Sequence, residues 1–146
     1  MTKHLRPALA LVLLTGLVAC GRLGGPVDDK VTWLSLEEGR AEATSYQAGK
    51  PLLYDFTAGW CPPCRQMSKE VFADQASADF INENFIPIKL LDEKAGRAER
   101  ELAREMKIQS YPTLVVVRSD GYVIRRVGYA GRDATMDFLR RSLGES

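Results

Sequence analysis

Histidine and cysteine are scarce in this sequence. Its 146 residues include one histidine, His4, and three cysteines, Cys20, Cys61 and Cys64. A structural zinc site takes about four such ligands, and His4 and Cys20 lie within the first 20 residues, far along the chain from the other two. The sequence therefore predicts no metal site.

An excess of charge of either sign is also missing. Lysine and arginine together number 20, aspartate and glutamate number 19, and the net charge is +1. Acidic and basic residues are interspersed, and no basic run is interleaved with aromatic residues. Nucleic-acid binding depends on such a basic surface, so we expect no nucleic-acid partner.

No apolar stretch is long enough to cross a membrane as a helix, which takes about 20 residues. The most apolar stretch, residues 7–19, is shorter and follows a basic segment that contains Lys3 and Arg6. This pattern is typical of a signal peptide. We therefore predict that residues 1–19 direct export, with a permanent transmembrane anchor as the alternative.

The residues that end at Cys20, LVAC, resemble the lipobox of bacterial lipoproteins, in which the cysteine is acylated and the chain is cut just before it. Acylation of Cys20 would leave an even number of cysteines free to pair in an exported chain. The alternative is an ordinary secretory signal followed by an incidental cysteine. In a Gram-negative organism, Gly21 after the cysteine resembles the sorting pattern for the outer membrane.

Residues 20–30 are dense in glycine and contain Pro26, so we predict a lipidated, flexible tether on the periplasmic side of a bacterial membrane. Residues 31–146 are enough for a single domain. In this domain we expect strands at 31–34, 51–58, 85–91, 113–117 and 122–127, and helices at 36–48, 61–72, 74–84, 95–106 and 133–143. Their order predicts an α/β fold, a central mixed sheet flanked by helices on both faces.

The motif that carries chemistry is Cys61-Pro62-Pro63-Cys64, which follows the predicted central strand. At a strand-to-helix junction Cys61 takes the N-cap position, and the helix N-terminus favours its thiolate form. Pro62 and Pro63 withhold two N–H donors, so we expect the pKa of Cys61 to fall only modestly below its ordinary value of ~8.5. This favours a reductase over an oxidase.

A plain structural disulfide between Cys61 and Cys64 is an alternative, since exported proteins use such bonds freely. A bridge that closes so short a loop removes little entropy from the unfolded chain. Its structural value would therefore be small.

Two segments resemble the thioredoxin family: DFTAGWCPPC at residues 55–64 and SYPT at residues 110–113. KPLLYDFTAGWCPPC followed by EVFAD is most similar to the periplasmic C-terminal domain of transmembrane thiol-disulfide interchange reductases. The resemblance implies a thioredoxin-like fold over roughly residues 31–143. It also implies that Cys61 is the nucleophile and Cys64 the resolving cysteine.

By the same resemblance, Asp55 is a buried carboxylate beneath the cysteine pair, and Lys89 is its companion on the next strand. Burial raises the pKa of a carboxyl group, so Asp55 could accept the Cys64 proton through water. The alternative is an ion pair of Asp55 with Lys89 that serves only structure.

The resemblance further implies a substrate-binding surface around the cysteines. Pro112 is expected in cis, and the backbone of the preceding residue holds an extended substrate segment as an added strand. Trp60 is expected at the surface, with a core position as its alternative. Tyr111, Thr57 and Gly59 depart from the residues common in thioredoxins. The predicted binding residues are Trp60, Pro62, Pro63, Tyr111, Pro112 and Thr113.

Together these features predict a monomeric protein-disulfide reductase that needs no cofactor. Its substrates would be disulfide-bonded exported proteins, and a membrane reductase would supply its electrons. Two alternatives remain open: a disulfide oxidase or isomerase, and a non-catalytic adaptor or chaperone with the same fold.

Overall fold

The computed structural model describes residues 28–45 and 49–144. Its centre is a four-stranded sheet in the order β2-β1-β3-β4, made of β1 (Leu52–Thr57), β2 (Ile86–Leu91), β3 (Thr113–Val117) and β4 (Val123–Val127). β1 pairs parallel with β2 and antiparallel with β3, and β4 is antiparallel to β3. The predicted α/β fold with a mixed sheet is confirmed.

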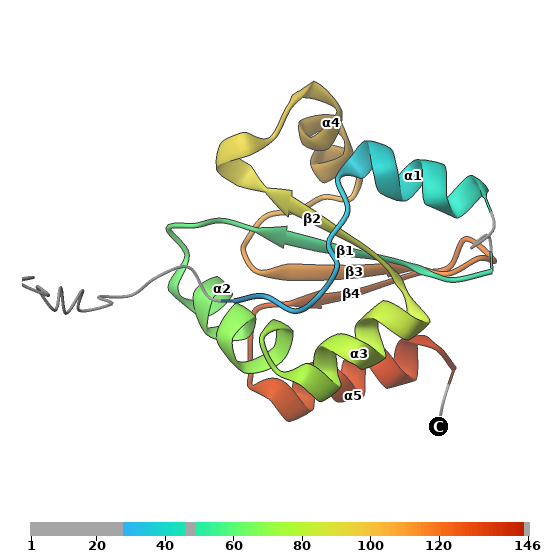
Figure 1. Cartoon of the computed structure of the whole chain (residues 1–146). Coiled ribbons are helices and arrows are strands. Elements are labelled where there is room, and N and C mark those ends of the chain that lie inside the picture. Colours follow the sequence, from blue (N-terminus) through green and yellow to red (C-terminus); the bar gives the residue numbers. More distant parts are fainter. Residues whose placement is uncertain (1–27, 46–48, 145–146) are drawn as a thin grey trace, which may run out of the picture.

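Helices cover both faces of this sheet (Figure 1). One face carries α1 (Leu36–Thr44) and α4 (Arg97–Glu105). The other carries α2 (Pro62–Met67), the π-helix η1 (Ser68–Phe72), α3 (Gln75–Asn84) and α5 (Arg132–Ser142). A single 3-10 turn, η2 (Asp92–Lys94), follows β2.

The alternation of β1 side chains decides which core each residue joins. Leu53 packs in the cluster that contains Met67 and Val71, on the α2 side of the sheet. Tyr54 and Phe56 pack in the other cluster, on the α1 and α4 side. Asp55 alternates with Tyr54 and Phe56, so its side chain lies on the α2 side, the side that carries the cysteines.

Three predicted elements differ from the structure. The strand expected at 31–34 is reduced to a bridge between Leu34 and Ile88. The helix expected over 61–72 changes to a π-helix at Ser68, where Ala73 N–H donates to Ser68 C=O at 2.9 Å. The last helix begins at Arg132 rather than at an Asp133 cap, because Gly131, with φ of 96°, turns the chain into it.

Residues just before the predicted domain already contact it. The predicted tether extends to Lys30, yet Lys30 N–H donates to Phe72 C=O at 2.8 Å. The predicted signal peptide, Cys20 and the rest of the tether lie outside the described residues. Within the described ranges, no helix combines the length and the apolar character that crossing a membrane demands.

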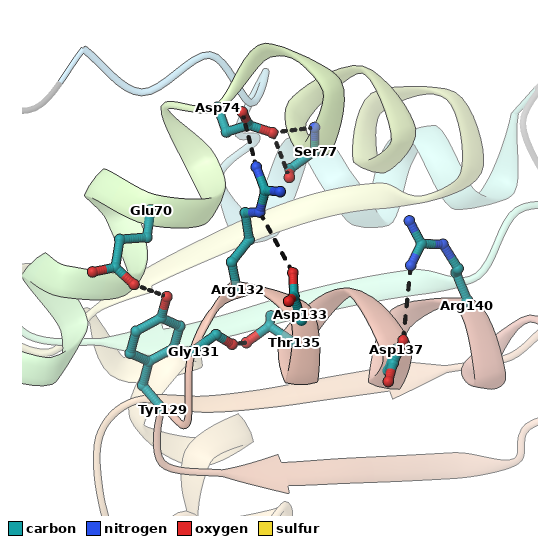
Figure 2. Close-up of polar contacts among 10 residues, drawn as sticks. All are labelled: Glu70, Asp74, Ser77, Tyr129, Gly131, Arg132, Asp133, Thr135, Asp137 and Arg140. Carbon is teal, nitrogen blue, oxygen red and sulfur yellow. Dashed lines mark hydrogen bonds and ion pairs between the residues drawn. The ribbon is translucent and has the colours of Figure 1, made fainter.

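Polar contacts fix α5 against η1 and α3 (Figure 2). The Tyr129 hydroxyl donates to Glu70 Oε2 at 2.6 Å, and this hydrogen bond raises the pKa of Tyr129 in addition to the effect of burial. Arg132 Nη1 lies 3.3 Å from Asp74 Oδ1, and Asp74 in turn caps α3 through the Ser77 N–H. These contacts brace the π-helix that continues from the cysteine-bearing helix.

Candidate active site

Cys61 and Cys64 lie at the start of α2 and form a disulfide with a Cα–Cα distance of 5.3 Å. Cys61 is the N-cap residue, and the Cys64 N–H donates to its Sγ at 3.3 Å. Both side chains are buried and pack with Ala58 and Tyr111. The strand end thus delivers the first sulfur to a helix N-terminus.

Pro62 and Pro63 occupy the first two positions of α2. Proline has no N–H, so neither residue can donate to the Cys61 sulfur. Among the described residues, the Cys64 N–H makes the one hydrogen bond to that sulfur. A Cys61 thiolate at this position would receive limited stabilisation.

A second loop faces the cysteines from the start of β3. Its Tyr111–Pro112 peptide bond is cis. Pro112 C=O accepts from the Gly128 N–H at 2.8 Å, and Thr113 Oγ1 donates to Ser110 C=O at 2.8 Å. No hydrogen bond within the described ranges uses the backbone N–H or C=O of Tyr111. This backbone is free to pair with an extended segment of another chain.

Trp60 lies beside the cysteines with 63% of its surface exposed, so the alternative of a core position is wrong. Its ring stands edge-on to that of Tyr111, with 6.0 Å between centroids. The two aromatic rings connect the cysteine loop and the cis-proline loop.

Asp55 is fully buried, with 1% of its surface exposed. Neither carboxylate oxygen has a hydrogen-bond partner among the described residues. Burial raises the pKa of Asp55 from 3.8 to about 7, against the lowering effect of Lys89 and with a smaller raising effect from Asp29. A carboxyl group of this kind exchanges protons near neutral pH.

Lys89 is opposite Asp55 in the β1–β2 register, as the resemblance implies. Its ammonium, however, pairs with Asp29 Oδ2 at 2.5 Å and not with Asp55. The structural ion pair between Asp55 and Lys89, one of the two interpretations, is therefore absent from the described structure. Asp29 carried no sequence signal for this role, because it lies in the segment predicted to be a tether.

Sequence reasoning also missed two carboxylates in η2. Glu93 Oε1 accepts from the Gly59 N–H at 2.6 Å, and Asp92 Oδ1 accepts from the Tyr111 hydroxyl at 2.8 Å. Burial, and next the contact with Asp92, raise the pKa of Tyr111 to about 12. A signal was available: η2 follows β2, and the carboxyl ends of the parallel strands β1 and β2 meet at one sheet edge.

A hollow of about 220 Å³ lies between α3 and α5, away from the cysteines. Its charged side chains pair with one another, Arg132 with Asp74 and Asp133, and Arg140 with Asp137 (Figure 2). Because these charged side chains are already engaged with one another, the hollow is a weaker candidate site than the cysteine pair.

The chain matches a known protein family and has relatives among characterised proteins. Residues 39–142 match the family described as thioredoxin-like domain. The chain is 35% identical over 98 residues to thioredoxin H5 of Arabidopsis thaliana, covering 67% of this chain and 75% of that protein. It is 28% identical over 97 residues to a protein disulfide-isomerase of Hordeum vulgare, covering 66% of this chain but 18% of the isomerase.

Among solved structures, the DsbD C-terminal domain of Neisseria meningitidis, in its oxidised form, has a TM-score of 0.59 to this chain. The two are 21% identical, and the match covers 72% of this chain and 89% of that domain. The likeness shows a common fold, and the family resemblance drawn from the two sequence segments is confirmed.

Proposed function

The chain belongs to the family of thioredoxin-like domains and is a thiol-disulfide oxidoreductase with a Cys61–Cys64 pair, and we propose that it reduces protein disulfides outside the cytoplasm. The observation that carries the proposal is the position of Cys61. It caps a helix next to a second cysteine, beside the Tyr111 backbone and the buried Asp55 carboxyl group, neither of which has a hydrogen-bond partner in the described part of the chain.

The reaction starts with the reduced pair. The Cys61 thiolate attacks one sulfur of a substrate disulfide, the substrate S–S bond breaks, and a mixed disulfide forms between Cys61 and the substrate. The free backbone of Tyr111 holds the extended substrate segment, and Trp60 covers it. The leaving substrate sulfur takes up a proton.

Cys64 completes the cycle. Its thiol gives its proton to the carboxylate of Asp55, through water, and the resulting thiolate attacks the Cys61 sulfur. The mixed disulfide breaks as the Cys61–Cys64 bond forms, and the second substrate sulfur leaves as a thiolate that takes up a proton from water, so the substrate is released as a dithiol. Two electrons have passed from the protein to the substrate, and no cofactor takes part.

The limited set of donors at Cys61 supports the reductive direction. In strongly oxidising relatives the thiolate of the first cysteine is stabilised. This lowers the free energy of the reduced form, so the disulfide form readily accepts electrons. Here two prolines withhold their donors, and the Cys64 N–H alone remains among the described residues. The reduced pair is therefore a good electron donor.

We place this activity on the periplasmic side of a bacterial membrane, with Cys20 acylated. Because each turnover oxidises the pair, a membrane reductase must restore the dithiol. A Cys20→Ser chain should be lost from the membrane fraction and should fail to incorporate labelled fatty acid. Retention of the label by Cys20→Ser would contradict the lipid anchor.

Reduction of insulin by dithiothreitol tests the proposed activity. The wild-type protein should accelerate the reaction, Cys61→Ser should abolish the acceleration, and Cys20→Ser serves as the matched cysteine control with full activity. Cys64→Ser should accumulate mixed disulfides at Cys61 and so capture the substrates. Insulin reduction by Cys61→Ser at the wild-type rate would contradict the mechanism.

The similarity to a protein disulfide-isomerase favours one second candidate, a disulfide isomerase. An isomerase reactivates scrambled ribonuclease without a net supply of electrons. An isomerase added in its reduced form regains its thiolate in every cycle, whereas a reductase is left oxidised after one turnover. We therefore expect this protein, added reduced and without dithiothreitol, to restore little ribonuclease activity.

A further inference from the structure

Asp29 makes several contacts although it precedes the first element of the fold. Its Oδ2 accepts from the Trp33 indole N–H at 2.8 Å and lies 2.5 Å from Lys89 Nζ. Its Oδ1 accepts from the Val31 N–H at 3.2 Å. The Val31 N–H, the Trp33 indole and the Lys89 ammonium thus hold the Asp29 carboxylate in one position.

Aromatic rings hold the Lys89 ammonium in the same place. Its Nζ lies 4.7 Å from the centroid of the Trp33 ring and 5.4 Å from that of Phe72. The Trp33 ring in turn packs edge-on against Phe72, with 4.9 Å between centroids. The ammonium is therefore held by Asp29 and two aromatic faces.

Asp55 is the nearest cross-strand neighbour of Lys89 on β1, yet neither of its carboxylate oxygens has a hydrogen-bond partner among the described residues. The charged groups around Asp55 come from few elements. β2 contributes Lys89 and the N-terminal segment contributes Asp29. On β3 its partner is the apolar Leu114, and Arg126 on β4 lies one strand further along the same row.

The helices on this face of the sheet contribute apolar core residues and one titratable thiol near the cysteine pair. Met67 of α2 and Val71 of η1 belong to the core cluster on the Asp55 side of the sheet. Cys64 of α2 adds a titratable thiol when the pair is reduced. Lys89 is thus the charge with most influence on Asp55, and Asp29 is the group that neutralises it.

We propose that Asp29 is a positioning residue for the redox cycle: it engages the Lys89 ammonium and so leaves the Asp55 carboxylate uncompensated and able to take the Cys64 proton. The proposal rests on the proposed function of Asp55. It connects the end of the predicted membrane tether, through Lys89, to the buried acid. Asp29 does not touch the cysteines; it acts chiefly through Lys89, beside its own smaller raising effect on the pKa of Asp55.

The proposal predicts the direction in which the Asp55 titration moves. In Asp29→Asn the amide keeps its oxygen acceptor, but Lys89 becomes a net positive charge beside Asp55. A nearby positive charge favours the ionised carboxylate. The titration midpoint of Asp55 should fall by about one pH unit.

Carbon-13 NMR of the Asp55 carboxyl group in the full oxidised chain measures this midpoint without any activity assay. Asp28→Asn is the matched control, because it removes the same charge one residue away, and it should leave the midpoint in place. In a Lys89→Met background, Asp29→Asn should produce less than half of its original shift. If Asp29→Asn does not fold, Asp29→Ser takes its place with the same expected shift.

Three results would overturn the proposal: an unchanged or higher midpoint in Asp29→Asn, an equal shift in Asp28→Asn, or a shift that persists in full with Lys89→Met. The pH profile of insulin reduction provides the second readout and should move to lower pH with the midpoint. A midpoint that moves in a protein without insulin reductase activity would count against the proposed function and leave the role of Asp29 standing.

Discussion

The backbone N–H of Gly59 donates to the Glu93 carboxylate at 2.6 Å. The next residue toward the N-terminus of η2, Asp92, accepts from the Tyr111 hydroxyl of the cis-proline loop. Two adjacent carboxylates therefore hold the two loops between which a substrate segment would lie. The width of that binding site depends on η2 as well as on the loops themselves.

Replacing Glu93 tests this dependence. Glu93→Leu removes the acceptor of the Gly59 N–H, and the displaced loop should lower kcat/KM for insulin about tenfold. Glu93→Gln keeps an oxygen acceptor and should stay within about twofold of the wild type. Equal losses in the two variants would show that charge, and not loop position, accounts for the effect.

Asp55→Asn should change how stability depends on pH. The folded-state pKa of Asp55 is raised to about 7 from 3.8, so the folded protein keeps a proton that the unfolded chain has lost between those pH values. The contribution of Asp55 to the free energy of unfolding should therefore be fully present below about pH 4. It should be lost, by about 4 kcal/mol in total, as the pH rises from there through 7.

The asparagine variant has no such group and should lose this part of the pH dependence, so it should be the more stable protein at pH 8. Urea unfolding of the oxidised proteins at pH 4, 6 and 8 measures the difference. Parallel pH curves for the two proteins would mean that Asp55 has an ordinary pKa in the fold.

Insulin reduction by Asp55→Asn should be several-fold slower near neutral pH, because the Cys64 proton has lost its acceptor.

Trp60→Ala should weaken recognition of protein substrates and spare the cysteine chemistry. The exposed ring lies against Tyr111 at the edge of the substrate site, and removal of such an anchor costs about 1–2 kcal/mol of binding. We expect a KM for insulin that rises several-fold, with reaction toward glutathione disulfide unchanged.

Tyr122→Ala is the matched control for Trp60. Tyr122 has the same exposed fraction, 63%, and lies at the β3–β4 turn, at the opposite end of the sheet from the cysteines. Tyr122→Ala should leave the reactions with insulin and with glutathione disulfide unchanged. A loss with Tyr122→Ala as large as that with Trp60→Ala would mean that the assay reports general surface changes.

The parts of the site that follow from local sequence were predictable. Trp60 and Cys61 follow soon after β1, and Pro62 and Pro63 start α2; both placements depend on residues adjacent in the chain. The cis bond before Pro112 was expected from the resemblance to thioredoxins and is present in the structure. The buried position of Asp55 was expected from the resemblance to thioredoxins, and the structure places it there.

Contacts between distant segments were not predictable in the same way. The Asp29–Lys89 pair joins residues 60 positions apart and the Glu93–Gly59 bond joins residues 34 apart. No local sequence pattern determines such partners, because they depend on how distant segments pack against each other. The strand predicted at 31–34 is cut short for a related reason: the Val31 and Thr32 N–H groups donate to side chains of Asp29 and Asn82, and Leu34 is the residue that pairs with β2.

The reduction potential of the Cys61–Cys64 pair, measured by equilibration with glutathione at pH 7, tests the central claim most directly. Because the described residues provide one N–H donor to the Cys61 sulfur, we predict a potential more negative than about −180 mV, the value typical of protein disulfide isomerase. A potential at or above that value would contradict a reductase and indicate that the pair donates its disulfide to folding proteins.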